Sequence, residues 1–289
     1  MKRQRGASLA EATIVLPLLL FSVLAVIQAA LVFHAKSSVN YAVFQAARAG
    51  TMDHARIDTI KAAFKKAILP YYGGGRTTEE LADSAAKVAE DVTDISLRIE
   101  ILSPTRESFQ DYNSPRLQTE LNQTEPVIPN VGLDELTCPR DGPDCNSNPA
   151  TNASGQTLLD ANLLKLRITY GIPPAKQMPM VGRFYTWALN QLNSAGGDSF
   201  KQALLDAGRI PVVTQTVMRM QSEPIRNAAM VSSPGAGNSG NPVDPGPAPG
   251  PGGGTSDPGG DPSSGNPPGG GDGSSGADNN KPPEEPPCF

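Results

Sequence analysis

The sequence predicts an α+β protein, in which a long N-terminal transmembrane helix continues into a domain with a small antiparallel sheet and covering helices. Three observations support this: an apolar run from Ala12 to Phe33, three stretches of alternating apolar and polar residues between helical patterns, and a C-terminal stretch of Gly, Pro and Ser. We expect a basic leader (1–6), a transmembrane helix (7–36), an α+β domain (37–232) and a disordered tail (233–289).

The apolar run is long enough to cross a bilayer. At ~1.5 Å per residue it spans a ~30 Å hydrocarbon core, and Pro17 lies in its first turns, where a missing N–H costs least. Lys2, Arg3 and Arg5 precede the run, so the positive-inside rule places the N-terminus in the cytoplasm and the domain in the periplasm. A cleaved signal peptide is the alternative, but its apolar core is usually only ~7–15 residues long and the small-x-small site at 35–37 is poor.

Three helical patterns follow. Residues 37–50 lack proline and are rich in alanine, so the membrane helix should continue into the periplasm, with a stripe of small residues that would let another helix approach closely. Residues 56–69 place apolar side chains on one face, and Pro70 ends this pattern. Residues 78–92 indicate a short helix with Thr77 or Thr78 as its N-cap.

Three stretches have the period of two that is typical of half-buried strands. They run from Ile95 to Ile101, from Leu164 to Tyr170 and from Ile210 to Met220. With helices between them, they predict an antiparallel sheet that is covered on one face.

An irregular loop of about residues 104–158 separates the first two strands. Its Pro, Asn, Asp and Gly residues favour a surface excursion, which we expect to be pinned by Cys138 and Cys145. In an oxidising periplasm these two cysteines could form a disulfide; a metal site is the alternative, although no further Cys and no His lies nearby to complete it. Cys288, near the end of the chain, is left over.

The only tryptophan lies in a further helical pattern, at residues 184–193. Phe184, Tyr185, Trp187, Leu189 and Leu192 recur at helical spacing, which predicts an amphipathic helix over the sheet; an aromatic anchor for a partner is the alternative. The preceding Pro- and Met-rich segment, 173–181, is expected to be an extended edge that contacts the membrane or a neighbouring subunit.

Composition and motifs exclude several classes of function. The formal net charge is −5 and no Lys/Arg-rich cluster occurs beyond the N-terminal tip, so we expect no nucleic-acid partner. His34 and His54 stand outside any known catalytic motif, and we expect no catalytic residues, no metal, no cofactor and no enzymatic activity. The tail is interpreted as a solvated spacer or, alternatively, as a reach through the cell wall layer towards an outer-membrane partner.

Four N-terminal segments carry a resemblance to a known family: RGASLAE at 5–11, VLPLLL at 15–20, NYA at 40–42 and AARAG at 46–50. Together they resemble the N-terminal signature of TadE-like proteins, the minor pseudopilins of the tight-adherence (Flp, or type IVb, pilus) system. LRITYG at 166–171, IPV at 210–212 and VMRMQS at 217–222 are more loosely similar to the closing strands of such domains.

The resemblance implies a function and a processing site. A prepilin peptidase would cut between Gly6 and Ala7, and Glu11 would then be the fifth residue of the mature chain and pair with the α-amino group of a neighbouring subunit. Without such a role, Glu11 would only face the headgroups near the positive end of the helix dipole. The family implies a single-pass protein of the bacterial inner membrane that contacts other pilus-assembly subunits and helps to assemble or initiate an adhesive pilus. A permanently anchored periplasmic interaction protein unrelated to pili is the alternative.

Overall fold

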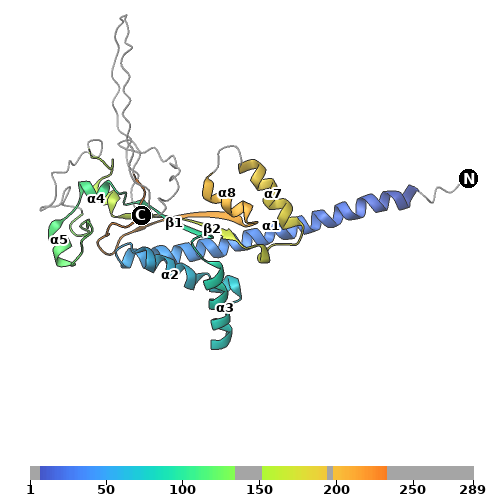
Figure 1. Ribbon diagram of the computed structural model, residues 1–289, viewed down its shortest axis with the longest axis horizontal. Coiled ribbons are helices and arrows are strands. Elements are labelled where there is room, and N and C mark those ends of the chain that lie inside the picture. The colour runs from blue at the N-terminus through green and yellow to red at the C-terminus, as the bar shows by residue number, and fades with distance from the viewer. Residues whose placement is uncertain (1–6, 134–151, 194–197, 233–289) are drawn as a thin grey trace, which may run out of the picture. The chain divides into compact units, whose positions relative to one another are not determined.

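The computed structural model describes residues 7–133, 152–193 and 198–232 (Figure 1). In chain order the elements are α1 (Ala7–Met52), α2 (Ile57–Ala67), η1 (Leu69–Tyr72), α3 (Thr78–Asp91), β1 (Leu97–Ser103), α4 (Ser108–Asp111), α5 (Pro115–Glu120), α6 (Leu158–Ala161), β2 (Leu163–Ile172), η3 (Pro174–Lys176), α7 (Val181–Asn193), α8 (Ser199–Asp206) and β3 (Ile210–Arg219). A long N-terminal helix followed by a small antiparallel sheet with helices confirms the predicted α+β class.

Helix α1 is continuous over 46 residues and includes Pro17 in its interior rather than in its first turn. The helix ends only at Met52, so the predicted continuation beyond the apolar run is confirmed. Its second half buries a stripe of small and β-branched side chains, namely Ala35, Val39, Ala42, Val43, Ala46 and Ala47. This stripe packs on α2 and the sheet of the same chain.

The sheet has the order β1-β2-β3, with every neighbouring pair antiparallel. In its register Leu97 lies opposite Tyr170, and Tyr170 opposite Val212, so these three side chains share one face. The first strand begins two residues later than predicted. Ile95 is 77% exposed, and the Thr93 N–H bonds to Ser96 Oγ at 3.0 Å in a turn that precedes β1.

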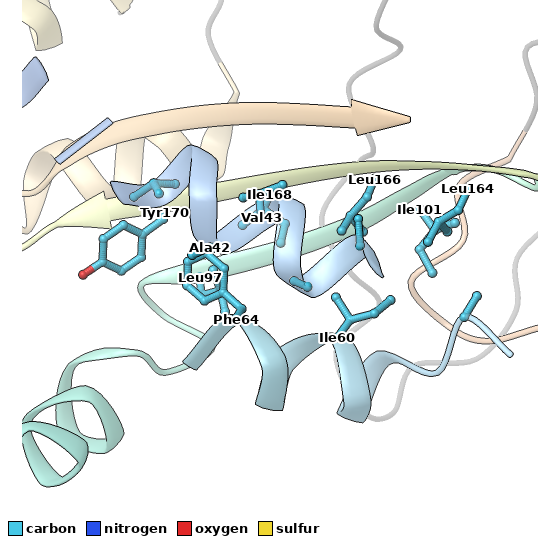
Figure 2. Packing of buried hydrophobic residues seen from close by; sticks show 14 of the residues in the cluster. Ala42, Val43, Ile60, Phe64, Leu97, Ile101, Leu164, Leu166, Ile168 and Tyr170 are labelled. Carbon is cyan, nitrogen blue, oxygen red and sulfur yellow. The ribbon is translucent and has the colours of Figure 1, made fainter. Parts of the chain in front are cut away.

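Helices α1 and α2 cover this apolar face (Figure 2). Ile60 and Phe64 of α2 are fully buried, as their helical spacing predicts, and the Phe64 ring lies 5.9 Å from that of Tyr170. Gly50 permits the close approach of α1 to α2, because a Cβ atom there would lie 2.7 Å from Ile60 Cγ1. The core therefore lies between the second half of α1, α2 and the sheet.

Charged residues line the opposite face of the sheet. Arg98 forms a two-pronged ion pair with Asp198, the N-cap of α8, with Nη1 to Oδ1 at 2.9 Å, and its guanidinium lies 4.9 Å from the centroid of the Phe200 ring. A Cβ atom at Gly171 would lie only 2.6 Å from Leu204 Cδ2. The lack of a side chain at Gly171 thus lets α8 lie against this face.

Residues 104–133 differ from the predicted surface excursion. Phe109, Tyr112, Val127 and Ile128 are buried, and the Tyr112 hydroxyl donates to the backbone oxygen of Gln156 at 2.5 Å. Polar side chains of this segment form hydrogen bonds with its own backbone. The apolar side chains between them form a small extension of the core. The surface prediction is therefore wrong for this part of the segment, whereas Cys138, Cys145 and Cys288 lie outside the described residues.

Candidate functional site

The predicted processing site lies at the start of α1. Gly6 precedes the described residues, Ala7 is the first residue of the helix, and Glu11 is exposed one turn further on. Among the described residues, none forms an ion pair or hydrogen bond with the Glu11 carboxylate. Glu11 therefore presents its charge at the entrance of the apolar half of α1.

The apolar half of α1 is exposed. Only 6% of its most apolar 18-residue window is buried, and exposed side chains extend from Ile14 (74%) to Phe33 (75%). A soluble domain rarely leaves a continuous apolar surface of this length in water. One long apolar N-terminal helix with this exposure is typical of a membrane anchor.

Contacts with the rest of the domain begin inside the apolar half of α1. Gln28 is 1% exposed, and its Oε1 accepts a hydrogen bond from the backbone N–H of Met178 at 2.8 Å. Seven residues earlier, the Phe21 ring packs edge-on against that of Phe184, with centroids 5.7 Å apart. Phe184 in turn lies 5.6 Å from Trp187.

Helix α7 therefore does not have its predicted position over the sheet. It packs mainly on α1 and α8, with Tyr185 and Leu189 turned toward the core. Phe184 and Trp187 remain more than half exposed on its other side (52% and 57%). The preceding segment also departs from an extended edge, because Pro174–Lys176 form the short helix η3.

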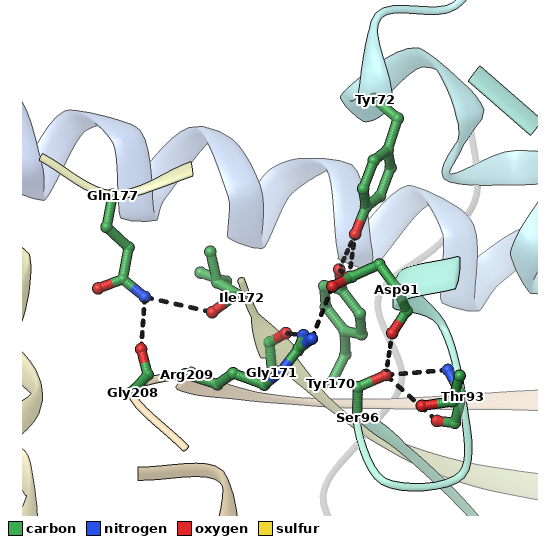
Figure 3. A network of polar contacts seen from close by, with 10 residues as sticks. All are labelled: Tyr72, Asp91, Thr93, Ser96, Tyr170, Gly171, Ile172, Gln177, Gly208 and Arg209. Atoms are coloured by element: carbon green, nitrogen blue, oxygen red, sulfur yellow. Dashed lines mark hydrogen bonds and ion pairs between the residues drawn. The ribbon is translucent and has the colours of Figure 1, made fainter. Parts of the chain in front are cut away.

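A network of polar contacts lies close to the start of the segment 173–181 (Figure 3). Asp91, at the end of α3, accepts hydrogen bonds from the hydroxyls of Tyr72 and Tyr170, the latter at 2.8 Å, and forms an ion pair with Arg209 at 2.7 Å. Arg209 also donates to the backbone oxygen of Gly171 at 3.0 Å. The network ties η1, α3 and both ends of the β2–β3 connection together.

Gln177, the residue before Met178, makes two further contacts near this network. Its Nε2 donates to the backbone oxygens of Ile172 at 3.2 Å and Gly208 at 2.9 Å (Figure 3). The end of β2 and the start of β3 thereby fix the segment that reaches Gln28. Because of this connection, the position of α7 on α1 depends on the same loops that carry the Asp91 network.

These contacts shift the pKa values of Asp91 and of the two tyrosines. Burial raises the pKa of Asp91, but the hydrogen bonds from Arg209, Tyr72 and Tyr170 outweigh burial and leave the pKa of Asp91 below its ordinary value. Burial raises the pKa of Tyr170 and Tyr72 well above the ordinary value, with the Asp91 charge acting in the same direction. The network is thus one carboxylate held by one cation and two neutral phenols.

The groups of this arrangement bond to one another and to the backbone of the domain. No group of His, Cys, Asp or Glu that could hold a metal occurs in the described part of the chain. An open hollow of about 590 Å³ lies beside Gly73–Gly75, but Glu80 on its wall belongs to the capping box of α3 with Thr77, and Ser84 donates to the backbone of Gly74. Glu80 and Ser84 are therefore engaged in local structure, and the three glycines lie in the connection before α3.

The geometry of α1 is that of an apolar helix with a carboxylate near its start and a packed second half. Residues 6–48 match the family model of TadE-like proteins. This is the family of Tad/Flp pilus proteins, so the resemblance seen in the sequence is confirmed over these residues, and the match indicates a Tad pilus-associated membrane protein. No curated protein and no solved structure matches the chain.

The TadE-like match covers most of the N-terminal signature but not the sheet. It includes Gly6, Glu11 and Gln28, and it ends at residue 48, within the buried second half of α1. The structure adds two relationships that were not predicted, those of Phe21 with Phe184 and of Gln28 with Met178. Gln28 carried a signal, since it is an amide inside an apolar run and needs a partner.

Proposed function

We propose that this chain is a non-enzymatic, pseudopilin-like membrane protein that helps to assemble or initiate a Flp-type adhesive pilus. The observation that carries the proposal is the coincidence of three features on one helix. These are the TadE-like match at 6–48, the exposed carboxylate of Glu11 and the exposed apolar surface that follows it.

In this proposal a prepilin peptidase cuts between Gly6 and Ala7. The mature chain then starts with the first residue of α1 and has Glu11 as its fifth residue. An ionised carboxylate at the edge of the hydrocarbon is costly unless a cation pairs with it. The new α-amino group of a neighbouring subunit is the cation that the proposal supplies, and this pairing would set the register of packed helices.

The remaining parts of the proposal follow from the orientation. The N-terminus is cytoplasmic in the bacterial inner membrane, and the domain after α1 faces other pilus-assembly subunits in the periplasm. There Cys138 and Cys145 form a disulfide, and the tail, 233–289, extends through the cell wall layer toward an outer-membrane partner. Mass spectrometry after alkylation, with and without a reductant, tests the disulfide directly.

Deletion of the gene tests the function. We expect cells to lose Flp-type fibres in electron micrographs and to adhere poorly, and the full chain to restore both. Glu11→Ala should restore fibres poorly, whereas Glu90→Gln, an exposed carboxylate on α3, should restore them fully. Normal fibres in the deletion strain would overturn the proposal and favour a permanent anchor unrelated to pili.

A further inference from the structure

Helix α7 is attached to α1 at two points within the apolar run. Phe184 contacts Phe21, and the Met178 N–H bonds to Gln28, so the first turn of α7 lies beside residues 21–28 of α1. In Figure 1, α7 begins beside α1 and leads away from it toward α8. The attachment is not at the end of the apolar run but well within it.

The exposed side chains of α1 indicate how deep in a bilayer these contacts lie. Phe33 is 75% exposed and lies five residues beyond Gln28, which is ~7 Å further along the helix axis. A bilayer that covers the exposed apolar surface from Ile14 to Phe33 therefore also covers the level of Phe21 and Gln28. The first turn of α7, which carries Phe184, lies at the level of Phe21.

The chemistry of α7 fits a lipid surface. Large apolar side chains are exposed on α7 and on the residue before it, with Met180 81%, Phe184 52%, Trp187 57% and Leu192 79% exposed. Residues 173–193 contain no acidic residue, and the cation Arg183 is exposed beside the aromatic residues. Trp and Arg are typical of the membrane interface, where the indole spans its polarity gradient and a long cation reaches the headgroups.

The other side of α7 is turned toward the domain. Asn190 donates to Asp206 of α8 at 3.2 Å, and the Thr186 hydroxyl donates within the helix at 3.0 Å. The outward side of α7 thus carries Arg183 together with the aromatic residues, whereas its inner side packs Tyr185 and Leu189 against the domain.

From this placement we infer that α7 is a membrane-associated helix, whose Phe184 and Trp187 enter the bilayer that α1 crosses. The occupant of the face is lipid because the exposed aromatic residues continue, through Phe21, the surface of α1 that lipid already covers. The inference rests on the proposed membrane anchor. It means that the domain is held on the membrane by two elements, which limits its rotation about α1.

Trp187 makes this inference measurable, because it is the only tryptophan in the chain. The full chain is reconstituted into vesicles of phosphatidylcholine and phosphatidylglycerol, with acyl chains either unmodified or brominated. We expect Trp187 to emit at short wavelength, to lose most of its emission in brominated vesicles and to be protected from aqueous acrylamide.

Two reporter variants in a Trp187→Phe background separate the outcomes. Phe33→Trp reports on the anchor, and Val131→Trp places an exposed reporter at the end of the domain far from α7. Quenching of Phe33→Trp but not of Trp187 by brominated lipid would overturn the inference and leave the anchor intact. A lack of lipid quenching in both would overturn the anchor too, and a Trp187 that neither quencher reaches would point to a second copy of the chain on this face.

Discussion

The side-chain oxygen of Gln28 accepts a hydrogen bond from the backbone N–H of Met178 at 2.8 Å, which joins the apolar half of α1 to the segment that leads into α7. Gln28 is almost completely buried, although it lies in a run of apolar residues. A buried amide in such a run is costly unless it is bonded. The bond satisfies the side-chain oxygen of Gln28 and holds the segment before α7 on α1, whereas the buried Nε2 of Gln28 has no hydrogen-bond partner among the described residues.

Replacement of Gln28 by Leu should loosen α7. The Met178 N–H would lose its acceptor, and an unsatisfied buried donor costs about 1–3 kcal/mol. Amide hydrogen exchange of the full chain in vesicles should show faster exchange over residues 177–184. Ser38→Ala is the control, because the Ser38 hydroxyl bonds only to His34 of its own helix, and equal exchange in the two variants would contradict the role given to Gln28.

Loss of the Asp91 carboxylate should destabilise the domain. Asp91→Ala leaves Arg209 without its partner and removes the acceptor of Tyr170, and breaking a buried ion pair in this way costs about 3–5 kcal/mol, less here because Arg209 retains some exposure. Urea unfolding of the full chain in detergent, followed by circular dichroism, measures the change. Asp94→Ala, which removes an exposed carboxylate paired with Lys61, should shift the midpoint little.

The same carboxylate should set part of the acid dependence of stability. Its pKa is lowered from the ordinary value of 3.8, so the unfolded chain takes up a proton at higher pH than the folded domain does. The stability that Asp91 contributes is therefore complete at neutral pH and is lost as the pH falls below 3.8 and through the folded pKa. Asp91→Asn should weaken the dependence of the free energy of unfolding on pH in this range, as measured by urea unfolding at a series of pH values. If the free energy of unfolding of the variant fell at low pH as it does for the unmodified chain, Asp91 would not be responsible for this fall. Asp198, whose pKa is also lowered, contributes in the same direction.

Gly50→Ala should be destabilising, against the usual trend. In an open helix this change stabilises by about 1 kcal/mol. Here the new Cβ atom would lie 2.7 Å from Ile60 Cγ1, so α1 and α2 must separate or Ile60 must move, at a cost of about 1–3 kcal/mol. A double-mutant cycle with Ile60→Ala tests the cause, because the penalty of Gly50→Ala should shrink in that background. Additive effects would contradict this explanation.

Much of the fold could be predicted from local patterns in the sequence. Ile60 and Phe64 are placed by helical spacing, Thr77 and Glu80 by their capping box, and Leu164 to Tyr170 by strict alternation, so these elements could be predicted from the sequence. Each depends on residues only a few positions apart.

Long-range relationships could not be predicted in the same way. Asp91 bonds to Tyr170 and Arg209, which are 79 and 118 positions away, and no periodicity links them. Phe184 and Trp187 have the spacing of an amphipathic helix, but spacing alone does not tell whether the sheet or another surface faces them. Residues 104–133 have the composition of a surface loop, and the burial of Tyr112 depends on the distant Gln156 and Asn152.

The start of the mature chain tests the pseudopilin proposal most directly. Intact mass and N-terminal sequencing would be done on protein from membranes of cells with and without an active prepilin peptidase. We expect a chain that starts at Ala7 only where the peptidase is active, which gives a neighbouring Glu11 its α-amino partner. A leader that is retained in both strains would contradict the proposal and leave a permanent anchor, and a start near Val39 would indicate an ordinary secreted protein.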